Sequence, residues 1–208
     1  MLIGFAPVAA LFALLTSGQA AQPPAADQVP ILSSHGSAVA APPTGGAAGA
    51  AGAAAAQHLG YTLPAAWTSQ TPSSGMRVAQ AVIPGIPGVA GASGPGQFAI
   101  FFFGPGGGGS ADANIQRWIE QIDKPLAPPR GETFTANGLK VRWIEVAGTL
   151  KAETIGMGPA TPQPGSRLLG AVVEGPGGPW YFKAIGPDAT IAAARGSFLA
   201  MLHGLRPR

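Results

Sequence analysis

Residues 97–123 carry the pattern that most limits how this chain can fold. The apolar run from Gln97 to Phe103 lacks the alternation of a half-exposed strand, so it predicts a strand buried on both faces. The glycine-rich segment Gly104–Ser110 follows and predicts a tight turn. From Ala111 to Asp123, apolar residues return at the spacing of an amphipathic helix, with Ser110 as its N-cap. A strand, a turn and a helix in immediate succession therefore anchor a folded domain.

The remainder of the folded part is predicted to contain further strands and one more helix. These strands are expected at Met76–Ile83, Glu132–Thr135, Leu139–Thr149, Arg167–Glu174 and Trp180–Ile185. Asn137-Gly138 is a strong hairpin signal, and glycines and prolines at 175–179 predict a second hairpin. A last helix should begin near Asp188, as its N-cap, and end at Gly204. The predicted class is therefore α+β, a mainly antiparallel β-sheet with two packed α-helices.

The N-terminal residues predict export. Residues 1–20 combine the apolar stretch Leu2–Leu15 with a small-residue end at Ala20, the pattern of a cleaved signal peptide. An uncleaved membrane anchor is the alternative, but about 15 helical residues span roughly 22 Å, short of a hydrocarbon core of about 30 Å. Residues 21–56, rich in Ala, Gly and Pro, predict a disordered linker because they offer no apolar face to bury. Residues 57–208 remain as a single domain, expected in the periplasm or outside the cell, without a stable membrane span after cleavage.

Composition and spacing exclude several kinds of chemistry. The 208 residues include no cysteine, so disulfides, zinc–thiolate sites and thiol catalysis are excluded. The formal net charge is +3 and the basic residues are scattered, which argues against nucleic-acid binding. His35, His58 and His203 have no metal-binding spacing, and no serine lies in a nucleophile elbow. The carboxylates are dispersed along the chain. We therefore predict no catalytic residue, no metal and no cofactor.

The glycine loop and the helix after it form the candidate recognition surface. The loop could cradle phosphate at a helix N-terminus, but it lacks the lysine of a Walker loop and Asp112 would repel phosphate, so a structural turn is favoured. Arg117 could pair with Glu120 or with a neighbouring strand; alternatively it binds a partner, as interface arginines do. The candidate partner-binding residues are Gly106, Gly107, Gly108, Asn114, Arg117 and Gln121.

Aromatic and charged residues in the strands leave a second hypothesis open. Trp143 and Trp180 are expected to pack in the core, and Arg142 and Lys183 to face outward as charges that protect the sheet. The alternative is a small-molecule-binding protein, or an unrecognised hydrolase, with a sheet–helix pocket near Trp143 or Trp180. A deep apolar cleft with a buried charged group would favour this alternative, and a filled sheet face would oppose it. A structural protein of the cell surface is a third hypothesis, which rests on the linker composition.

Several short motifs resemble those of a group of exported bacterial proteins. The matching residues are Trp67, Thr71–Arg77, Phe102–Gly104 with Gly107-Gly108, Asn114-Ile115, Arg117-Trp118, Gln121, Asn137–Leu139 and Lys183–Pro187. The layout of that group is similar to the PsbP-like fold, which is shared with the nuclear Mog-type Ran-binding proteins. The resemblance covers roughly Trp67 to Leu205. It implies a PsbP-like sandwich that acts without catalysis by docking on a larger assembly, here an envelope protein. It carries over no functional residue.

Overall fold

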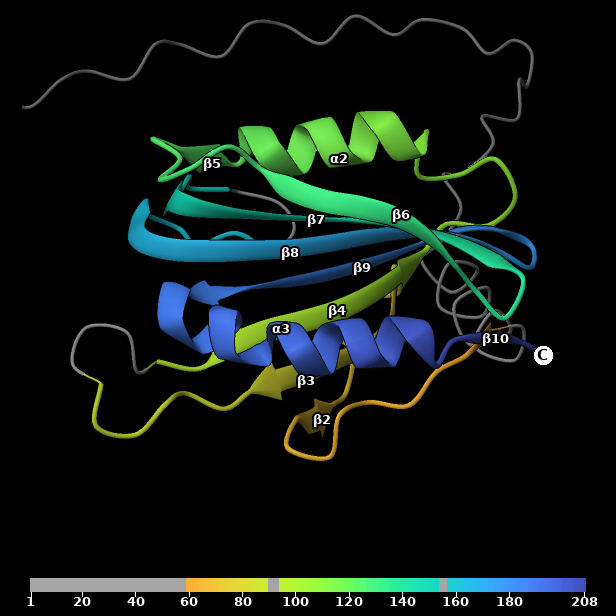
Figure 1. The fold of residues 1–208 in the computed structure, drawn as a ribbon, viewed down its shortest axis with the longest axis horizontal. Coiled ribbons are helices and arrows are strands. Elements are labelled where there is room, and N and C mark those ends of the chain that lie inside the picture. Colours follow the sequence, from red (N-terminus) through yellow and green to blue (C-terminus); the bar gives the residue numbers. More distant parts are fainter. Residues whose placement is uncertain (1–58, 90–93, 154–156) are drawn as a thin grey trace, which may run out of the picture. The chain divides into compact units, whose positions relative to one another are not determined.

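One antiparallel sheet organises the part of the chain that the structure, a computed structural model, describes: residues 59–89, 94–153 and 157–208 (Figure 1). The predicted signal peptide (1–20), the linker (21–56) and the first two residues of the predicted domain (57–58) lie outside these residues. The sheet order is β2 (Thr68–Gln70), β3 (Arg77–Ile83), β4 (Gly96–Phe102), β9 (Gly178–Pro187), β8 (Gln163–Gly175), β7 (Leu139–Leu150) and β5 (Ile122–Asp123), with β6 (Arg130–Ala136) also paired to β7. Every pairing is antiparallel.

The two hairpins predicted from their turn residues are confirmed. Asn137 and Gly138 have φ angles of 49° and 83°, the left-handed conformation that an Asn-Gly turn requires. Ala136 pairs with Leu139 across this turn, so it joins β6 to β7 directly. The second hairpin joins β8 to β9, whose ladder extends to the pair Gly175–Gly178. The α+β class with a mainly antiparallel sheet is therefore confirmed.

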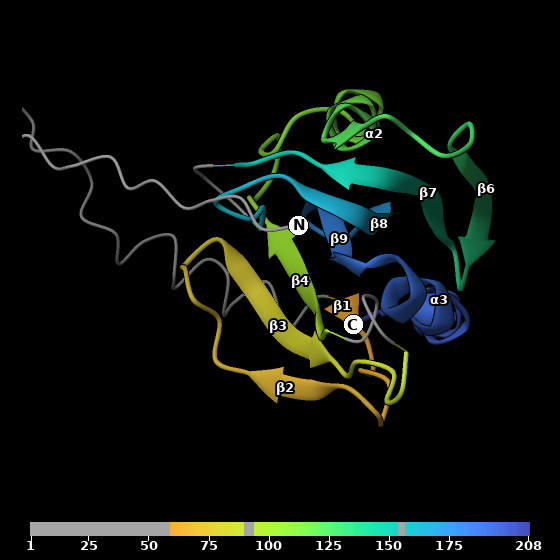
Figure 2. The ribbon, with the colours of Figure 1, turned by 90° about the vertical axis from the view of Figure 1, so that its left-hand side faces the viewer.

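The two helices lie on opposite faces of the sheet (Figures 1 and 2). Successive side chains of the central strand β8 pack alternately with the two helices. Leu168 and Val172 pack with α2 (Ala111–Glu120), whereas Leu169 and Val173 pack with α3 (Asp188–His203). The continuous apolar run of β8 follows from this arrangement, because both of its faces are covered. The sequence predicted two packed helices, and the structure assigns each of them its face.

Helix α2 ends earlier than the sequence predicts. The apolar stripe of the helix is correct: Ile115 and Trp118 are buried against the sheet. The predicted helix continued to Asp123, but it ends at Glu120, and residues 122–123 form the short strand β5. Ile122 is buried there by pairing opposite Leu150 at the end of β7. The helical spacing of Ile122 therefore reflects burial by a neighbouring strand.

Helix α3 presents the apolar face that the sequence predicts, but it begins differently. Ile191, Phe198 and Leu202 are fully buried against the sheet. Pro187 occupies the N-cap position and provides no side-chain hydrogen bond. Asp188, the predicted N-cap, is the first helical residue, and its carboxylate accepts a hydrogen bond of 2.8 Å from Arg167 Nε. An ion pair with the sheet therefore takes the place of a local cap.

A short ladder joins the two ends of the described part of the domain. Leu59–Gly60 (β1) pairs with Arg206–Pro207 (β10), and Leu59 and Leu205 are buried in the core under α3. Two-residue strands have no sequence signal, because a distant partner alone defines them. Neither of the helices in the described ranges has the length and apolar character that crossing a membrane requires.

Candidate functional site

A cleft of about 610 Å³ opens beside α2, on the face of the sheet opposite α3. Helix α2 packs over β7 and β8, and next to it β9 and β4 contribute Tyr181 and Phe101 to the lining. Asn114, Arg117 and Gln121 of the predicted polar stripe all line the cleft. The structure therefore places this stripe along one wall of a concavity.

The glycine loop closes one end of the cleft by folding over Tyr181. The Tyr181 hydroxyl donates a hydrogen bond of 2.7 Å to the carbonyl oxygen of Gly109. Gly108 has a φ of 78°, and a Cβ atom there would come within 2.6 Å of the Tyr181 ring and hydroxyl. Both the backbone conformation and the available space thus require glycine at this position. Gly108 lines the cleft.

The other two predicted contact glycines serve the turn and are not among the lining residues. A Cβ atom on Gly107 would lie 2.3 Å from the carbonyl oxygen of Phe103, so this glycine is needed for close packing. Gly106 has a φ of 71° and open space around its Cα. Both glycines are therefore explained by the tight turn that the sequence favoured for this loop.

Asn114 braces the loop and positions Arg117. The buried Asn114 side chain donates from Nδ2 to the carbonyl oxygens of Gly108, at 2.7 Å, and Ser110, at 2.9 Å. Its Oδ1 accepts a hydrogen bond from Arg117 Nη2. Arg117 therefore pairs with Asn114 and not with Glu120, whose carboxylate accepts a hydrogen bond from Gln116. Asn114 is a positioning residue, and the guanidinium it holds is exposed at the cleft wall.

The N-terminus of α2 is occupied by the protein's own groups. Ser110 is the N-cap, as predicted, and its Oγ accepts a hydrogen bond of 3.2 Å from the backbone N–H of Ala113. Asp112 in the first turn forms an ion pair with Arg142 of β7. Arg142 was expected only to face outward. The structure pairs it with Asp112, so it ties β7 to helix α2. These contacts leave the phosphate-cradle alternative without support.

Lys183 forms part of the cleft lining and is only 5% exposed, so the expectation that it faces outward is wrong. It lies on the central strand β9, between Gly170 of β8 and Ala99 of β4. The space beside Gly170 is filled by the Trp118 ring of α2, to which a Cβ atom on Gly170 would come within 2.4 Å. A covered central strand offers no exposed face, and this is why a rule for edge strands fails here.

The surroundings of Lys183 are unusual for an ammonium group. The nearest ion-pair partner is Glu153, with 3.9 Å between Nζ and Oε2. Burial lowers the pKa of Lys183 from 10.5 to about 8; the Glu153 charge opposes this lowering, and the charges of Arg117 and Arg77 add to it. Both forms of the amine are therefore populated near neutral pH.

A third cation, Arg77, is fixed near the same site. Its guanidinium lies 5.7 Å from the centre of the Phe101 ring. Its Nη1 donates hydrogen bonds to Ser73 Oγ at 2.7 Å and Gln80 Oε1 at 2.6 Å. Burial lowers the pKa of Arg77, but an arginine remains charged. Among the described residues, three cations and one carboxylate of the cleft lining, Glu153, thus act on this site, and the excess of positive charge favours an anion.

The walls of the cleft are apolar and aromatic. Phe101 and Phe103 stack with their ring centroids 6.3 Å apart, and Trp118 lines the wall opposite them. Phe103 is 42% exposed and Met76 is 45% exposed at the rim. Gln121 also lines the cleft, and its buried Oε1 has no hydrogen-bond partner within the described residues. A ligand with an apolar body and a polar head matches this lining.

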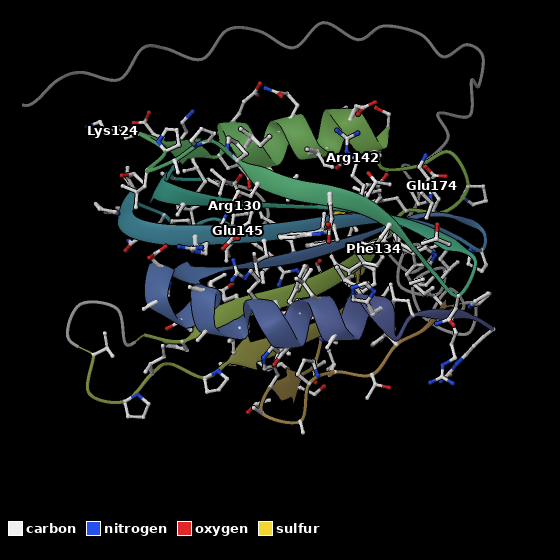
Figure 3. The ribbon with its side chains drawn as sticks, viewed as in Figure 1. Lys124, Arg130, Phe134, Arg142, Glu145 and Glu174 are labelled. Carbon is white, nitrogen blue, oxygen red and sulfur yellow. The ribbon has the colours of Figure 1, made fainter. Side chains whose placement is uncertain are left out.

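A second charged cluster lies under α3 and is separate from the cleft. Buried Glu145 of β7 accepts a hydrogen bond of 3.0 Å from Arg130 of β6, beside which it lies in Figure 3. It also accepts hydrogen bonds from Arg195 of α3 at 3.3 Å and from Arg167 of β8. Burial alone would raise the pKa of Glu145, but the hydrogen bond and charge of Arg167, supported by Arg195 and Arg130, lower it. Arg167 also pairs with Asp188. Because each of these charges has a partner, the cluster is a structural one that ties α3 to the sheet.

Sequence reasoning located one wall of the cleft and missed the residues opposite it. Lys183, Tyr181, Arg77 and Glu153 lie on other elements, and only the fold brings them to α2. One signal was present: Lys183 is the single charge within the apolar segment 180–185. The alternative pocket was placed near Trp143 or Trp180, but both tryptophans belong to the core under α3. Within the described ranges, no three His, Asp or Glu side chains gather to hold a metal.

Comparison with known proteins assigns the chain to no family. No protein-family model matches it, and no curated protein gives a significant match. Among solved structures it is similar to a protein of unknown function from Pseudomonas aeruginosa, with 14% sequence identity and a TM-score of 0.38. That match covers 73% of this chain and 98% of the other. A likeness this distant assigns no function.

Proposed function

We propose that this domain binds a small organic anion with an aromatic or branched apolar body in the cleft beside α2. The observation that carries the proposal is Lys183, an ammonium group buried in the lining of an open cleft of about 610 Å³. Among the residues that the structure describes, its ion-pair partner Glu153 remains 3.9 Å away, beyond hydrogen-bonding distance. This is the buried charge in an apolar cleft that distinguishes a small-molecule binder from a protein with a filled sheet face.

Electrostatics support an anionic ligand. Taking an ammonium out of water costs several kcal/mol unless a counter-ion offsets it, and Glu153 at 3.9 Å does so only in part. Arg117 and Arg77 add positive potential at Lys183, and their charges contribute to the lowering of its pKa. A carboxylate bound between Lys183 and Arg117 would relieve this repulsion, while Phe101 and Trp118 would contact the apolar body of the ligand.

The test is a calorimetric titration of the full chain with 3-phenylpropionate. A parallel titration uses its neutral analogue 3-phenylpropanamide. We expect the acid to bind and the amide to bind at least about tenfold more weakly, because a charge-assisted hydrogen bond is worth roughly 1.5–3 kcal/mol. Arg117→Gln should weaken binding of the acid to a similar degree. Arg206→Gln, which removes an exposed charge on β10, should not. Equal binding of acid and amide, or no binding of either, would contradict the proposal.

A second candidate function uses the same cleft for a protein partner, as the sequence predicted for an exported assembly module. The exposed side chains of Met76 and Phe103 at the rim favour it, because a partner segment with an acidic and an apolar residue could cover them. Phe103→Ser should then weaken capture of that partner more than it weakens binding of 3-phenylpropionate. Export to the envelope, the disordered linker and the PsbP-like resemblance remain predictions from the sequence.

A further inference from the structure

The position of the Lys183 amine suits a nucleophile as well as a counter-charge for an anionic ligand. The Lys183 side chain lines the cleft, and two small residues, Gly170 and Ala99, flank it on the neighbouring strands. An amine that served only as a counter-charge would be best placed in a close ion pair, yet Glu153 Oε2 remains 3.9 Å from Nζ. That separation leaves the amine without a tight ion pair and keeps a carboxylate close enough for proton transfer through small movements or one water.

We propose that the cleft binds a small keto acid or aldehyde acid and that Lys183 forms an imine with its carbonyl carbon. This inference rests on the proposed anion site and names the ligand class for it. Arg117 holds the carboxylate of the ligand, and the aromatic walls hold its apolar body. The carbonyl then faces Lys183 in the lining.

The reaction balances without any redox partner. The neutral Nζ attacks the carbonyl carbon, a C–N bond forms, and the C=O π pair moves to oxygen, which gains a proton to give a carbinolamine. Glu153 relays this proton from the nitrogen to the oxygen. It then relays the second proton of the nitrogen to the hydroxyl group; the C–O bond breaks, water leaves, and the nitrogen lone pair forms the C=N bond. The amine and the carbonyl thus give an imine and one water molecule, with no change in oxidation state.

The surroundings of Lys183 and Glu153 suit these roles. Because burial and the neighbouring arginines lower the pKa of Lys183 to about 8, a substantial fraction of the amine is neutral near physiological pH. Glu153 is held in place by its backbone N–H, which donates a hydrogen bond of 2.9 Å to Pro159, and by Gly158, where a Cβ atom would come within 2.4 Å of its side chain. The carboxylate is therefore positioned by packing that does not involve the lysine.

The chain offers a clean experiment because it contains only four lysines, and the other three, Lys124, Lys140 and Lys151, are exposed. The full chain is incubated at pH 8 with phenylpyruvate and sodium cyanoborohydride, and the reduced adduct is mapped by peptide mass spectrometry. We expect at least about tenfold more adduct at Lys183 than at any exposed lysine, since an ordinary lysine is almost fully protonated at this pH. Excess 3-phenylpropionate should suppress the adduct at Lys183 and leave the background unchanged.

The outcomes separate this inference from the proposed function. Binding of 3-phenylpropionate without a preferred adduct at Lys183 would overturn the imine and leave the anion site standing. A preferred adduct without binding of 3-phenylpropionate would support the lysine chemistry and overturn the anion site. Failure of both would overturn both for this ligand class. Glu153→Gln should lower the rate of adduct formation at saturating phenylpyruvate, whereas a rate unchanged by this substitution would remove Glu153 from the mechanism.

Discussion

Replacing Lys183 by methionine should remove a pH-dependent destabilisation of the folded protein. Burial lowers the pKa of Lys183 from 10.5 to about 8, so below pH 8 both the folded and unfolded states carry its proton and the cost of the buried charge is fully present. Between pH 8 and 10.5 the unfolded chain binds a proton that the folded state does not, and stability therefore rises with pH. At about 1.4 kcal/mol per pH unit, the wild type should gain about 3 kcal/mol over Lys183→Met between pH 7 and pH 10.5.

Guanidinium unfolding, followed by tryptophan fluorescence at several pH values, measures this difference, since all four tryptophans are buried. Burial raises the pKa of Tyr61 and of Tyr181, so their titration at the alkaline end is common to both proteins and largely cancels. Lys140→Met is the matched control, because the Lys140 side chain is 59% exposed. A difference between wild type and Lys183→Met that stays flat from pH 7 to pH 10.5 would refute the assignment of Lys183 as a buried, destabilised cation.

Three further substitutions test the loop, the ionic cluster and the helix cap by urea or thermal unfolding. Gly108→Ala should cost about 1–3 kcal/mol more than Gly106→Ala, because both glycines have positive φ but only Gly108 meets Tyr181; equal losses would contradict this account. Glu145→Gln should cost about 3 kcal/mol at pH 7, because it removes the carboxylate that pairs with Arg130 and Arg195 and leaves Arg167 with Asp188 alone. Since the pKa of Glu145 is lowered, that cost should shrink as the pH falls below about 4, and a constant cost would count against the ion pairs. Ser110→Ala should cost about 1 kcal/mol, and no loss would show that its hydrogen bond to the helix is unimportant.

Local patterns were sufficient to predict most of the sheet and both helices. The run Phe98–Phe102 is apolar throughout because α2 and α3 contribute to cores on its two faces. Asn137-Gly138 determines its own turn, so the hairpin could be predicted from two residues. By contrast, β5 and β1 consist of two residues each and exist only through pairing with distant segments. Local propensity cannot predict elements of this kind.

The candidate site was predictable only on its helical side. Asn114, Arg117 and Gln121 share one face of a helix, so their spacing alone brings them together. Whether Lys183 is buried depends on which strands flank it, and sheet order is a property of the whole chain. A rule that treats charged strand residues as outward-facing suits an edge strand and fails for β9, which has neighbours on both sides.

The composition of the cleft distinguishes it from a packing defect. A void left by imperfect packing is lined by apolar groups and stays dry, because no polar group there can bind water. Much of the α3 face of this sheet is packed by such groups, with Phe98, Phe182 and Phe198 fully buried, and the buried Glu145 on this face is paired with arginines. On the α2 face the unfilled volume coincides with a buried ammonium, Lys183, and a buried amide oxygen of Gln121. Burying these two polar groups lowers the free energy of unfolding relative to apolar side chains such as leucine at the same positions. A binding site requires this coincidence of empty volume with polar groups whose burial the protein compensates only in part, and the coincidence supports a polar ligand in the cleft.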